Sequence, residues 1–314
     1  MSTRRFIFAG LTTLFFIVLD LLQYPDNLSA LQLLIFQFRL PRLIAVALAA
    51  VALAVSGLII QTITENPLAD SGTMGLTSGA SAGAVAFMLL SERLNLSSVW
   101  TFSYPIFAVA GAGLAFSLIY FFAIRKKLSN SRILLTGIAV TALFQALITL
   151  LQLAINPNDF QQIATWIAGD VWQTDTLYLA ILAGALLILM LLLHPFAKRL
   201  ELLSLGDEQA TTLGLNVPQT KRRLYLLALG FASIGVALVG GLAFLGLIAP
   251  HIARRLTGFS IRKRLTMTVL TGLSLLILAD FLSQTLIAPS TLPLGFIVAA
   301  IGAPYYIYLI QKEI

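Results

Sequence analysis

The sequence contains no cysteine and few charged residues. The absence of cysteine excludes disulfides, thiolate metal sites and cysteine nucleophiles. Asp, Glu, Lys and Arg together make up 11% of the 314 residues, against about 25% in an ordinary soluble domain. Because 59% of the residues are hydrophobic, so few charges cannot cover the surface of a soluble core of this size. The composition therefore excludes a soluble enzyme, a disordered chain and a disulfide-stabilised secreted domain, and it predicts an all-α membrane protein.

Sequence motifs for catalysis are also missing. No phosphate-binding loop of the form GxxxxGK[ST] occurs, so the chain is not expected to hydrolyse ATP by itself. No His-Glu-x-x-His pair is present, and the two histidines, His194 and His251, are far apart in the sequence. We therefore expect a protein that is not an enzyme and has no catalytic residue, metal or cofactor of its own. The net charge of +7 does not by itself indicate nucleic acid binding, and none is predicted.

The positions of the basic residues predict how the chain crosses the membrane. A helix needs about 20 apolar residues to cross the hydrocarbon core, and the sequence contains several stretches of that length. Seventeen of the 20 Lys and Arg residues fall into five clusters, at residues 4–5, 125–132, 198–223, 254–264 and 312. The positive-inside rule places all five clusters in the cytoplasm, so an even number of crossings must separate neighbouring clusters. This pattern predicts a single domain over residues 1–314, with ten transmembrane helices and both termini in the cytoplasm.

One stretch is too short for two ordinary spans. Residues 224–253 must cross the membrane twice, because basic clusters that are predicted to be cytoplasmic flank them on both sides. At least one of the two helices is therefore predicted to be short or broken. Residues that suit such a break are Gly240, Gly241, Gly246 and Pro250.

Several charged or polar residues occupy unusual places. Arg39 and Arg42, in the motif Arg39-Leu-Pro-Arg42, fall on the predicted outer side, against the orientation rule. They suit either docking of an acidic partner or binding of lipid headgroups. Asp280 lies deep in an apolar stretch, where a carboxylate needs partners; backbone amides at a helix end are one such set. His251 suits a structural hydrogen bond, and a ligand or proton carrier is the alternative.

Two connecting segments have distinctive sequences. Glu65-Asn-Pro-Leu-Ala-Asp70 precedes a run of small residues, which indicates either a tight turn between spans or a functional interruption. The cytoplasmic segment at about 198–223 is predicted to contain a short helix, with Asp207 as its N-cap, Leu213 on its apolar side and Gly214 as its C-cap. Such a segment either docks another protein or lies on the lipid surface as an interfacial helix.

These features, in this order, resemble the FecCD family of ABC-transporter permeases, which import iron–siderophore complexes, haem and vitamin B12. The motifs that carry the resemblance extend from about residue 35 to the end of the chain. They are Arg39-Leu-Pro-Arg42, Asn66-Pro-Leu-Ala-Asp70, Gly206-Asp-Glu-x-Ala-x-x-Leu-Gly214, Gly246-Leu-Ile-Ala-Pro-His251, Ala279-Asp280, Pro293-x-Gly295 and Gly302-Ala-Pro304. The resemblance implies the type II ABC importer permease architecture with ten helices, in the cytoplasmic membrane of a bacterium.

The resemblance also implies roles for particular residues. Docking of an extracytoplasmic substrate-binding protein falls on Arg39 and Arg42. Coupling to the ATPase falls on Gly206, Asp207, Glu208, Ala210, Leu213 and Gly214. The cytoplasmic gate falls on Ser129, Asn130 and Ser131. Further motif positions are Asn66, Pro67, Asp70, Pro250, His251, Asp280, Pro293 and Gly295.

The partners and cargo follow from the same resemblance. The implied partners are two ATPase subunits, which bind the ATP, a second permease subunit in a homo- or heterodimer, the binding protein and the lipid bilayer. The implied cargo is a ferric siderophore, with haem or a corrinoid as the alternative. Some family members have an arginine where this chain has Gln284, so docking there is predicted to be weaker or made differently. A secondary transporter, the rival class, would need several intramembrane acids, and only Asp280 fits.

Overall fold

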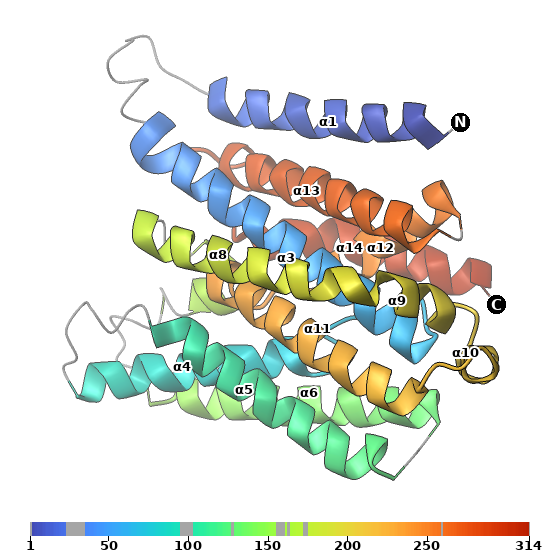
Figure 1. Ribbon diagram of the computed structural model, residues 1–314. Coiled ribbons are helices and arrows are strands. Elements are labelled where there is room, and N and C mark those ends of the chain that lie inside the picture. Colours follow the sequence, from blue (N-terminus) through green and yellow to red (C-terminus); the bar gives the residue numbers. More distant parts are fainter. Residues whose placement is uncertain are drawn as a thin grey trace.

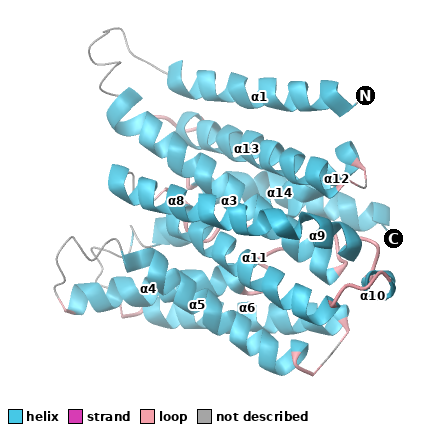
Figure 2. Cartoon of the chain, in the orientation of Figure 1, coloured by secondary structure: helices cyan, strands magenta, loops and turns pink. Residues whose placement is uncertain are grey.

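The computed structural model describes residues 2–22, 35–94, 103–126, 129–154, 161, 164–171, 175–258 and 260–313. Within these residues all regular structure is helical (Figure 1, Figure 2). The longer helices are α1 (Ser2–Leu22), α3 (Leu40–Thr64), α4 (Leu76–Arg93), α5 (Tyr104–Ile119), α6 (Asn130–Gln152), α8 (Thr176–Leu193), α11 (Val217–Val239), α12 (Leu245–Thr257), α13 (Ile261–Thr285) and α14 (Leu294–Glu313). The short ones are η1 (Ile35–Arg39), η3 (Tyr120–Ile124), η4 (His194–Phe196), α9 (Ala197–Leu203) and α10 (Asp207–Thr212).

Six helices in the described part of the chain are long and apolar enough to cross a membrane. They are the helices built around α3, α5, α6, α8, α11 and α13. Shorter apolar helices are present at residues 5–18 and 294–309. The prediction of an all-α membrane protein is confirmed, whereas the prediction of ten crossings stays a prediction.

Helix α3 forms the centre of the bundle. Pro41 lies in its first turn, where a missing N–H costs nothing, and no charged residue interrupts it between Arg42 and its end. Most of its small residues are fully buried and allow α11, α12 and α13 to pack closely against it. At Gly57 a β-carbon would lie 1.8 Å from the carbonyl oxygen of Gly246 on α12. The two backbones therefore touch at this crossing, and only glycine fits there.

The predicted break between residues 224 and 253 is confirmed. Helix α11 ends at Val239, and Gly240 follows it with a φ of 69°. The chain then passes through a short irregular segment to Phe244, which has a φ of 66°, and α12 has only 13 residues. Gly246 and Pro250 lie inside α12, so the pair at 240–241, and not these two, makes the break.

The helices run roughly side by side, with α1 beside α13 at one edge of the bundle and α5 and α6 at the opposite edge (Figure 1). Both chain ends and α10 lie at the same end of the bundle in this view, and α3 begins at the other end. A hydrogen bond of 2.8 Å from Arg5 Nη1 to the carbonyl of Leu256 joins the start of α1 to the end of α12. We call the end of the bundle that holds α10 the inner end.

Candidate functional site

A cluster of polar side chains joins four elements at the inner end. Glu65 caps α3 in a left-handed conformation, with a φ of 51°. Its carboxylate Oε1 accepts a hydrogen bond of 3.2 Å from Asn130 Nδ2 and lies 3.7 Å from Lys221 Nζ. Lys221 also forms an ion pair with Asp207. These four residues, which we call the inner cluster, connect the end of α3 and the starts of α6, α10 and α11.

The segment around α10 is a short helix closed by glycine, as predicted. Gly214 follows the helix with a φ of 86°, and its N–H donates to the carbonyl of Thr211 at 2.9 Å. The N–H of Leu215 donates to the carbonyl of Ala210 at 3.0 Å. This pair of bonds is the Schellman arrangement, which satisfies the last carbonyls of a helix. Ala210 is fully buried, so α10 is anchored on one side.

Two details of the predicted α10 helix are wrong. The N-cap is Gly206, with a φ of 103°, and Asp207 is the first helical residue. The side chain of Asp207 turns to Lys221 instead of capping the helix. Leu213 is 59% exposed and does not pack on an apolar side. Together with the exposed side chain of Glu208, it gives α10 a solvent-facing surface of mixed chemistry.

The predicted gate residues lie at the start of α6. Ser129 is the N-cap in extended conformation, Asn130 begins the helix, and Ser129 and Ser131 are exposed. Asn130 is the residue that the inner cluster uses, through Glu65. The structure therefore brings one predicted gate residue into contact with the end of α3, and the gating role itself stays a prediction.

The segment after Glu65 forms a tight turn. Asn66 Oδ1 accepts from the N–H of Leu68 at 2.9 Å, and Asp70 Oδ1 accepts from the N–H of Thr73 at 2.7 Å. The Thr73 hydroxyl also donates to the carbonyl of Asp70 at 3.0 Å. Asn and Asp side chains commonly fix turns in this way. The segment is thus the tight turn that one of the two interpretations predicted, and Asp70 is buried in it.

A second cluster lies near the start of α3, at the end of the bundle opposite α10. Arg42 Nη2 is 2.8 Å from Asp280 Oδ1 and 2.8 Å from Asp170 Oδ1, and Arg42 Nε donates to Asp280 at 3.0 Å. Gln284 Nε2 donates to the other oxygen of Asp280 at 2.8 Å. We call these four residues the outer cluster. Asp280 is fully buried, so the predicted need for partners is confirmed. Those partners are side chains, not the backbone amides of a helix end.

The outer cluster includes only one of the two predicted docking arginines. Arg42 is held by two acids of its own chain, and its side chain is 23% exposed. Arg39 ends η1 and is half-buried. Docking by either residue stays a prediction. Sequence reasoning missed the roles of Asp170 and Gln284 in binding Arg42 and Asp280.

Three further motif residues lie at contacts between helices or at a helix end. His251 is buried in α12, and its ring lies edge-on to Tyr305 of α14, with 6.0 Å between the centroids. Gly295 donates its N–H to the carbonyl of Gly169 at 2.7 Å. A β-carbon at Gly295 would lie 2.0 Å from the carbonyl oxygen of Ala168, so the backbone itself occupies that space. Pro293 directly precedes α14.

Two peripheral helices expose faces of different chemistry. The exposed face of α8 beyond Thr176 consists of aliphatic residues, alanine and glycine, as lipid contact favours. The exposed face of α6 includes Gln145, Thr149 and several alanines together with five large aliphatic residues, namely Leu135, Ile138, Leu143, Leu147 and Leu150. A cavity of about 410 Å³ lies beside α6, and its polar lining includes Asp70, Thr77, Ser81 and Gln145. In the described residues no group of three or more His, Cys, Asp or Glu side chains is arranged to hold a metal ion.

Comparison with known proteins identifies the family. The model of the FecCD transport family matches residues 6–312. The chain is 41% identical over 284 residues to the iron(3+)-hydroxamate import system permease protein FhuG of Bacillus subtilis, covering 90% of this chain and 84% of that protein. It is 37% identical over 278 residues to the hemin transport system permease protein HmuU of Yersinia pestis, covering 88% and 82%.

A solved structure shares the fold. It is titled as an inward-facing conformation of a metal-chelate type ABC transporter, and it matches with a TM-score of 0.84 at 27% identity. The match covers 99% of this chain and 100% of that one. The same all-helical arrangement therefore extends over both chains. Because the family model spans nearly the whole sequence and the FhuG relative covers most of it, the chain belongs to the FecCD transport family of membrane permeases.

Proposed function

We propose that the chain is the membrane-spanning subunit of an ATP-driven importer of ferric siderophores. The observation that carries this proposal is the 41% identity, over 90% of the chain, to a permease of an iron(3+)-hydroxamate import system. The hemin permease relative supports haem as the alternative cargo, and a corrinoid is the second alternative. Iron would travel as a chelate, because the chain offers no cysteine and only two histidines as strong ligands.

The proposed topology has ten spans and both termini in the cytoplasm. Four helices supplement the six long apolar ones, namely α1, α4, α12 and α14. Both chain ends lie at the inner end together with α10 (Figure 1), which an even number of crossings requires. The basic clusters at 198–223 and 254–264 favour the cytoplasm for this end.

The face of α6 is the proposed wall of the translocation path. The exposed amide of Gln145 would be unfavourable against lipid tails. The aliphatic residues on the same face suit contact with a second permease subunit beside the path. The neighbouring cavity with Asp70, Thr77 and Ser81 would extend the polar path into the bundle. Helix α8, with its aliphatic exposed face, would contact lipid. A homo- or heterodimer that meets across α6 would enclose the path.

Helix α10 is the proposed contact with the ATPase subunits. Its exposed Glu208 and Leu213 would bind the ATPase, while the buried Ala210 anchors it to the permease. The inner cluster then links α10 to α3 and α6 through Lys221, Glu65 and Asn130. A movement of α10 would thereby reach the predicted gate at 129–131. Coupling of this kind needs contacts that differ between two states of the protein, and the ion pairs of Lys221 can supply that difference.

The transport proposal is tested with the reconstituted complex. Proteoliposomes with the permease, its ATPase and its binding protein would be given radiolabelled iron in several chelates, with haem and cobalamin as competitors. We expect ATP-dependent accumulation of a ferric siderophore that neither competitor blocks. Competition by haem or cobalamin would transfer the assignment to that cargo. Accumulation without ATP, driven by an ion gradient, would refute an ABC importer.

The coupling proposal is tested at Lys221. Lys221→Met leaves the carboxylates of Glu65 and Asp207 without their shared cation. We expect the ATPase to copurify as before while the iron transported per ATP hydrolysed falls. Lys198→Met is the matched control, because Lys198 is an exposed lysine in the same cytoplasmic segment. Equal ratios of transport to hydrolysis in the two variants would refute the role of the inner cluster.

A further inference from the structure

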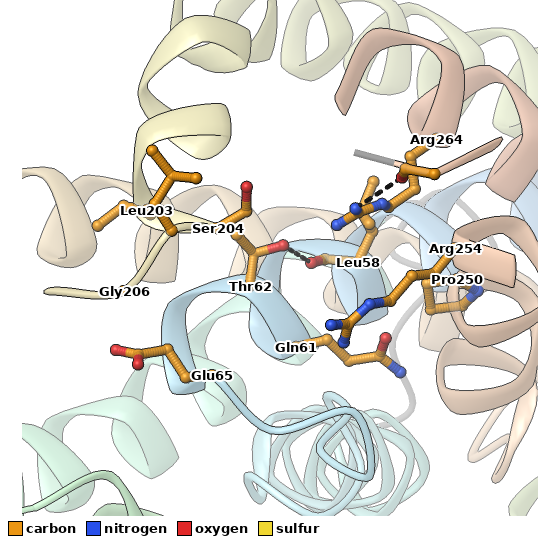
Figure 3. Close-up of a pocket in the computed structure, with 12 residues that line it drawn as sticks. Leu58, Gln61, Thr62, Glu65, Leu203, Ser204, Gly206, Pro250, Arg254 and Arg264 are labelled. Atoms are coloured by element: carbon orange, nitrogen blue, oxygen red, sulfur yellow. Dashed lines mark hydrogen bonds between the residues drawn. The ribbon is translucent and has the colours of Figure 1, made fainter. Parts of the chain in front are cut away.

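A polar cavity of about 400 Å³ opens beside the inner cluster, between α3, the connection from α9 to α10, α12 and the start of α13. Its polar lining consists of Gln61, Thr62, Glu65, Ser204, Arg254 and Arg264. Figure 3 shows Arg254 and Arg264 on one side of this cavity and Glu65 at the opposite side. The cavity is therefore polarised, with two guanidinium groups on one wall.

Arg264 is an unusual residue for a cavity wall. It is only 7% exposed, and its Nη2 donates to the carbonyl of Gly258 at 2.9 Å. Its Nε is buried and has no hydrogen-bond partner among the described residues. No carboxylate of the described residues forms an ion pair with it within 4.0 Å. A largely buried guanidinium without an ion-paired carboxylate is costly, so an anion bound from outside the chain would stabilise it.

The charged surroundings of Arg264 do not compensate it fully, because Arg254 repels its guanidinium more strongly than Glu201 attracts it. Arg254 is near enough to repel the Arg264 guanidinium. Arg264 lies in the first turn of α13. This turn, Ile261-Arg-Lys-Arg264, contains no acidic residue. Ser260, the N-cap, makes no side-chain capping bond. The start of a helix carries partial positive charge and favours anions, so three basic residues there are the reverse of the usual distribution.

Glu65 does not supply the missing negative charge. Its carboxylate is bound to Asn130 and lies next to Lys221, and in Figure 3 it points away from Arg264. Glu201 attracts Arg264 but forms no ion pair with it. The positive wall of the cavity is therefore open to a ligand from outside the chain.

We propose that this cavity binds a phosphate-bearing anion, with Arg254 and Arg264 as its ligands. Arginine forms charge-assisted, often bidentate hydrogen bonds with phosphate. A volume of about 400 Å³ admits a phosphate group with part of a headgroup attached. Basic pockets between helices on the cytoplasmic side suit anionic phospholipids, and a soluble phosphate has the same chemistry. Only the placement of the cavity on the cytoplasmic side rests on the proposed function. The charge of the cavity wall and the burial of Arg264 do not depend on it.

Binding of the two sources can be measured separately on the purified full chain. Native mass spectrometry would count phosphatidylglycerol retained from mixed micelles, with phosphatidylcholine as the reference lipid. Thermal unfolding with added inorganic phosphate, with chloride at equal ionic strength as the reference, would report the soluble ligand. Variants would be Arg264→Gln and the exposed Arg254→Gln, and Arg255→Gln is the matched control because Arg255 is exposed on the same helix and does not line the cavity.

We expect the wild type to retain phosphatidylglycerol over phosphatidylcholine, or to be stabilised by phosphate. Arg264→Gln should weaken this binding by about tenfold or more, since each bond to a charged group contributes that much. Arg255→Gln should leave it unchanged. If Arg264→Gln does not fold, Arg254→Gln carries the test. Displacement of the lipid by phosphate would show that both probes bind one shared site. Selective binding of one probe would identify a lipid or a soluble phosphate as the natural ligand.

Three results would overturn the proposal. The first is equal retention of both lipids together with no effect of phosphate. The second is the same loss of binding in Arg255→Gln as in Arg264→Gln. The third is loss of ATPase copurification in Arg254→Gln with unchanged binding of both probes, which would assign the cavity to an acidic side chain of the ATPase. Because these measurements need neither transport nor ATP, they can fail while the transport proposal holds.

Discussion

The outer cluster predicts that Arg42 and Asp280 stabilise the fold as a unit. Arg42 makes two hydrogen bonds to Asp280 and one to Asp170, and Asp280 has no exposed surface. Removing one member of a buried ion pair costs about 3–5 kcal/mol. Because the Arg42 side chain is 23% exposed, water can relieve part of the loss. We therefore expect Arg42→Gln to cost about 3 kcal/mol, the lower end of that range.

The partner variant should behave differently. Asp280→Asn keeps an oxygen that can accept from Arg42, and Arg42 retains its ion pair with Asp170. We expect a cost of about 1–2 kcal/mol, that of weakening a bond to a charged group. In the double variant Asp280 no longer carries a charge that has lost Arg42, and only Asp170 is left without its arginine. The cost should therefore fall below the sum of the single costs by about 2 kcal/mol, within the range of coupled neighbours.

Equilibrium unfolding in mixed micelles with rising SDS, followed by tryptophan fluorescence, measures all three variants. Arg93→Gln is the matched control, because Arg93 is an exposed arginine at the end of α4 and lies outside the outer cluster. The reasoning would be wrong if Arg42→Gln unfolded within about 0.5 kcal/mol of the wild type, the scatter of surface substitutions. Strictly additive single costs would refute the pairing of Arg42 with Asp280 as well.

Three further predictions concern Arg39, Gly57 and Gly214. Arg39→Glu should lower siderophore uptake several-fold in preparations whose folding the unfolding assay has checked, whereas normal uptake and normal capture of the binding protein would refute docking at Arg39. Gly57→Val should cost about 3 kcal/mol or more in the unfolding assay, since its side chain would meet the backbone of Gly246; Gly113→Val, which has open space around it, should fold like the wild type. Gly214→Val should fray α10 by about 1–2 kcal/mol, because the left-handed conformation disfavours branched residues, and should reduce ATPase copurification. Gly214→Asn should restore copurification, and failure of this rescue would show that backbone conformation is not the cause.

The structure changes how a charge reversal at Arg42 must be interpreted. Arg42→Glu would place a third carboxylate beside Asp170 and Asp280. Two like charges about 4 Å apart repel by about 4 kcal/mol at an effective dielectric constant of 20. Loss of uptake in this variant would therefore report damage to the fold as much as loss of docking. Arg39 gives the cleaner test, since it lies outside the outer cluster.

Much of the fold could be predicted because lipid restricts what a chain can do. Long apolar stretches must be helical. Residues 224–253 are too few for two ordinary crossings, and this predicted the break that Gly240 makes. The short helix before Gly214 followed from local cap chemistry, which depends on neighbouring residues. Asp207 was misplaced by one position as the N-cap, because its side chain binds Lys221, 14 residues away, and local rules do not contain that contact.

The pairing of charges could not be predicted for a related reason. Arg42 is 128 residues from Asp170 and 238 residues from Asp280. Arg42 and Asp280 were conspicuous in the sequence and Asp170 was not, and charge counting cannot show which of the three meet. The inner cluster was less visible still, because Glu65 was only part of a turn motif and Lys221 only part of a basic run. Such contacts depend on how helices cross, which spacing in a sequence does not specify.

Both clusters lie on the same helix, and this placement has a mechanical consequence. Helix α3 has 25 residues and is therefore about 37 Å long, with Arg42 near its start and Glu65 directly after its end. Between them its buried alanines and Gly57 touch α11, α12 and α13, and close packing of this kind transmits displacement instead of absorbing it. If α10 moves with the ATPase, Lys221 transmits the movement to Glu65 at the inner end of α3. The outer end of α3 is held by the ion pairs of Arg42 with Asp170 and Asp280. Helix α3 can then tilt only if the inner or the outer cluster rearranges. The two clusters together therefore determine which orientations α3 can adopt.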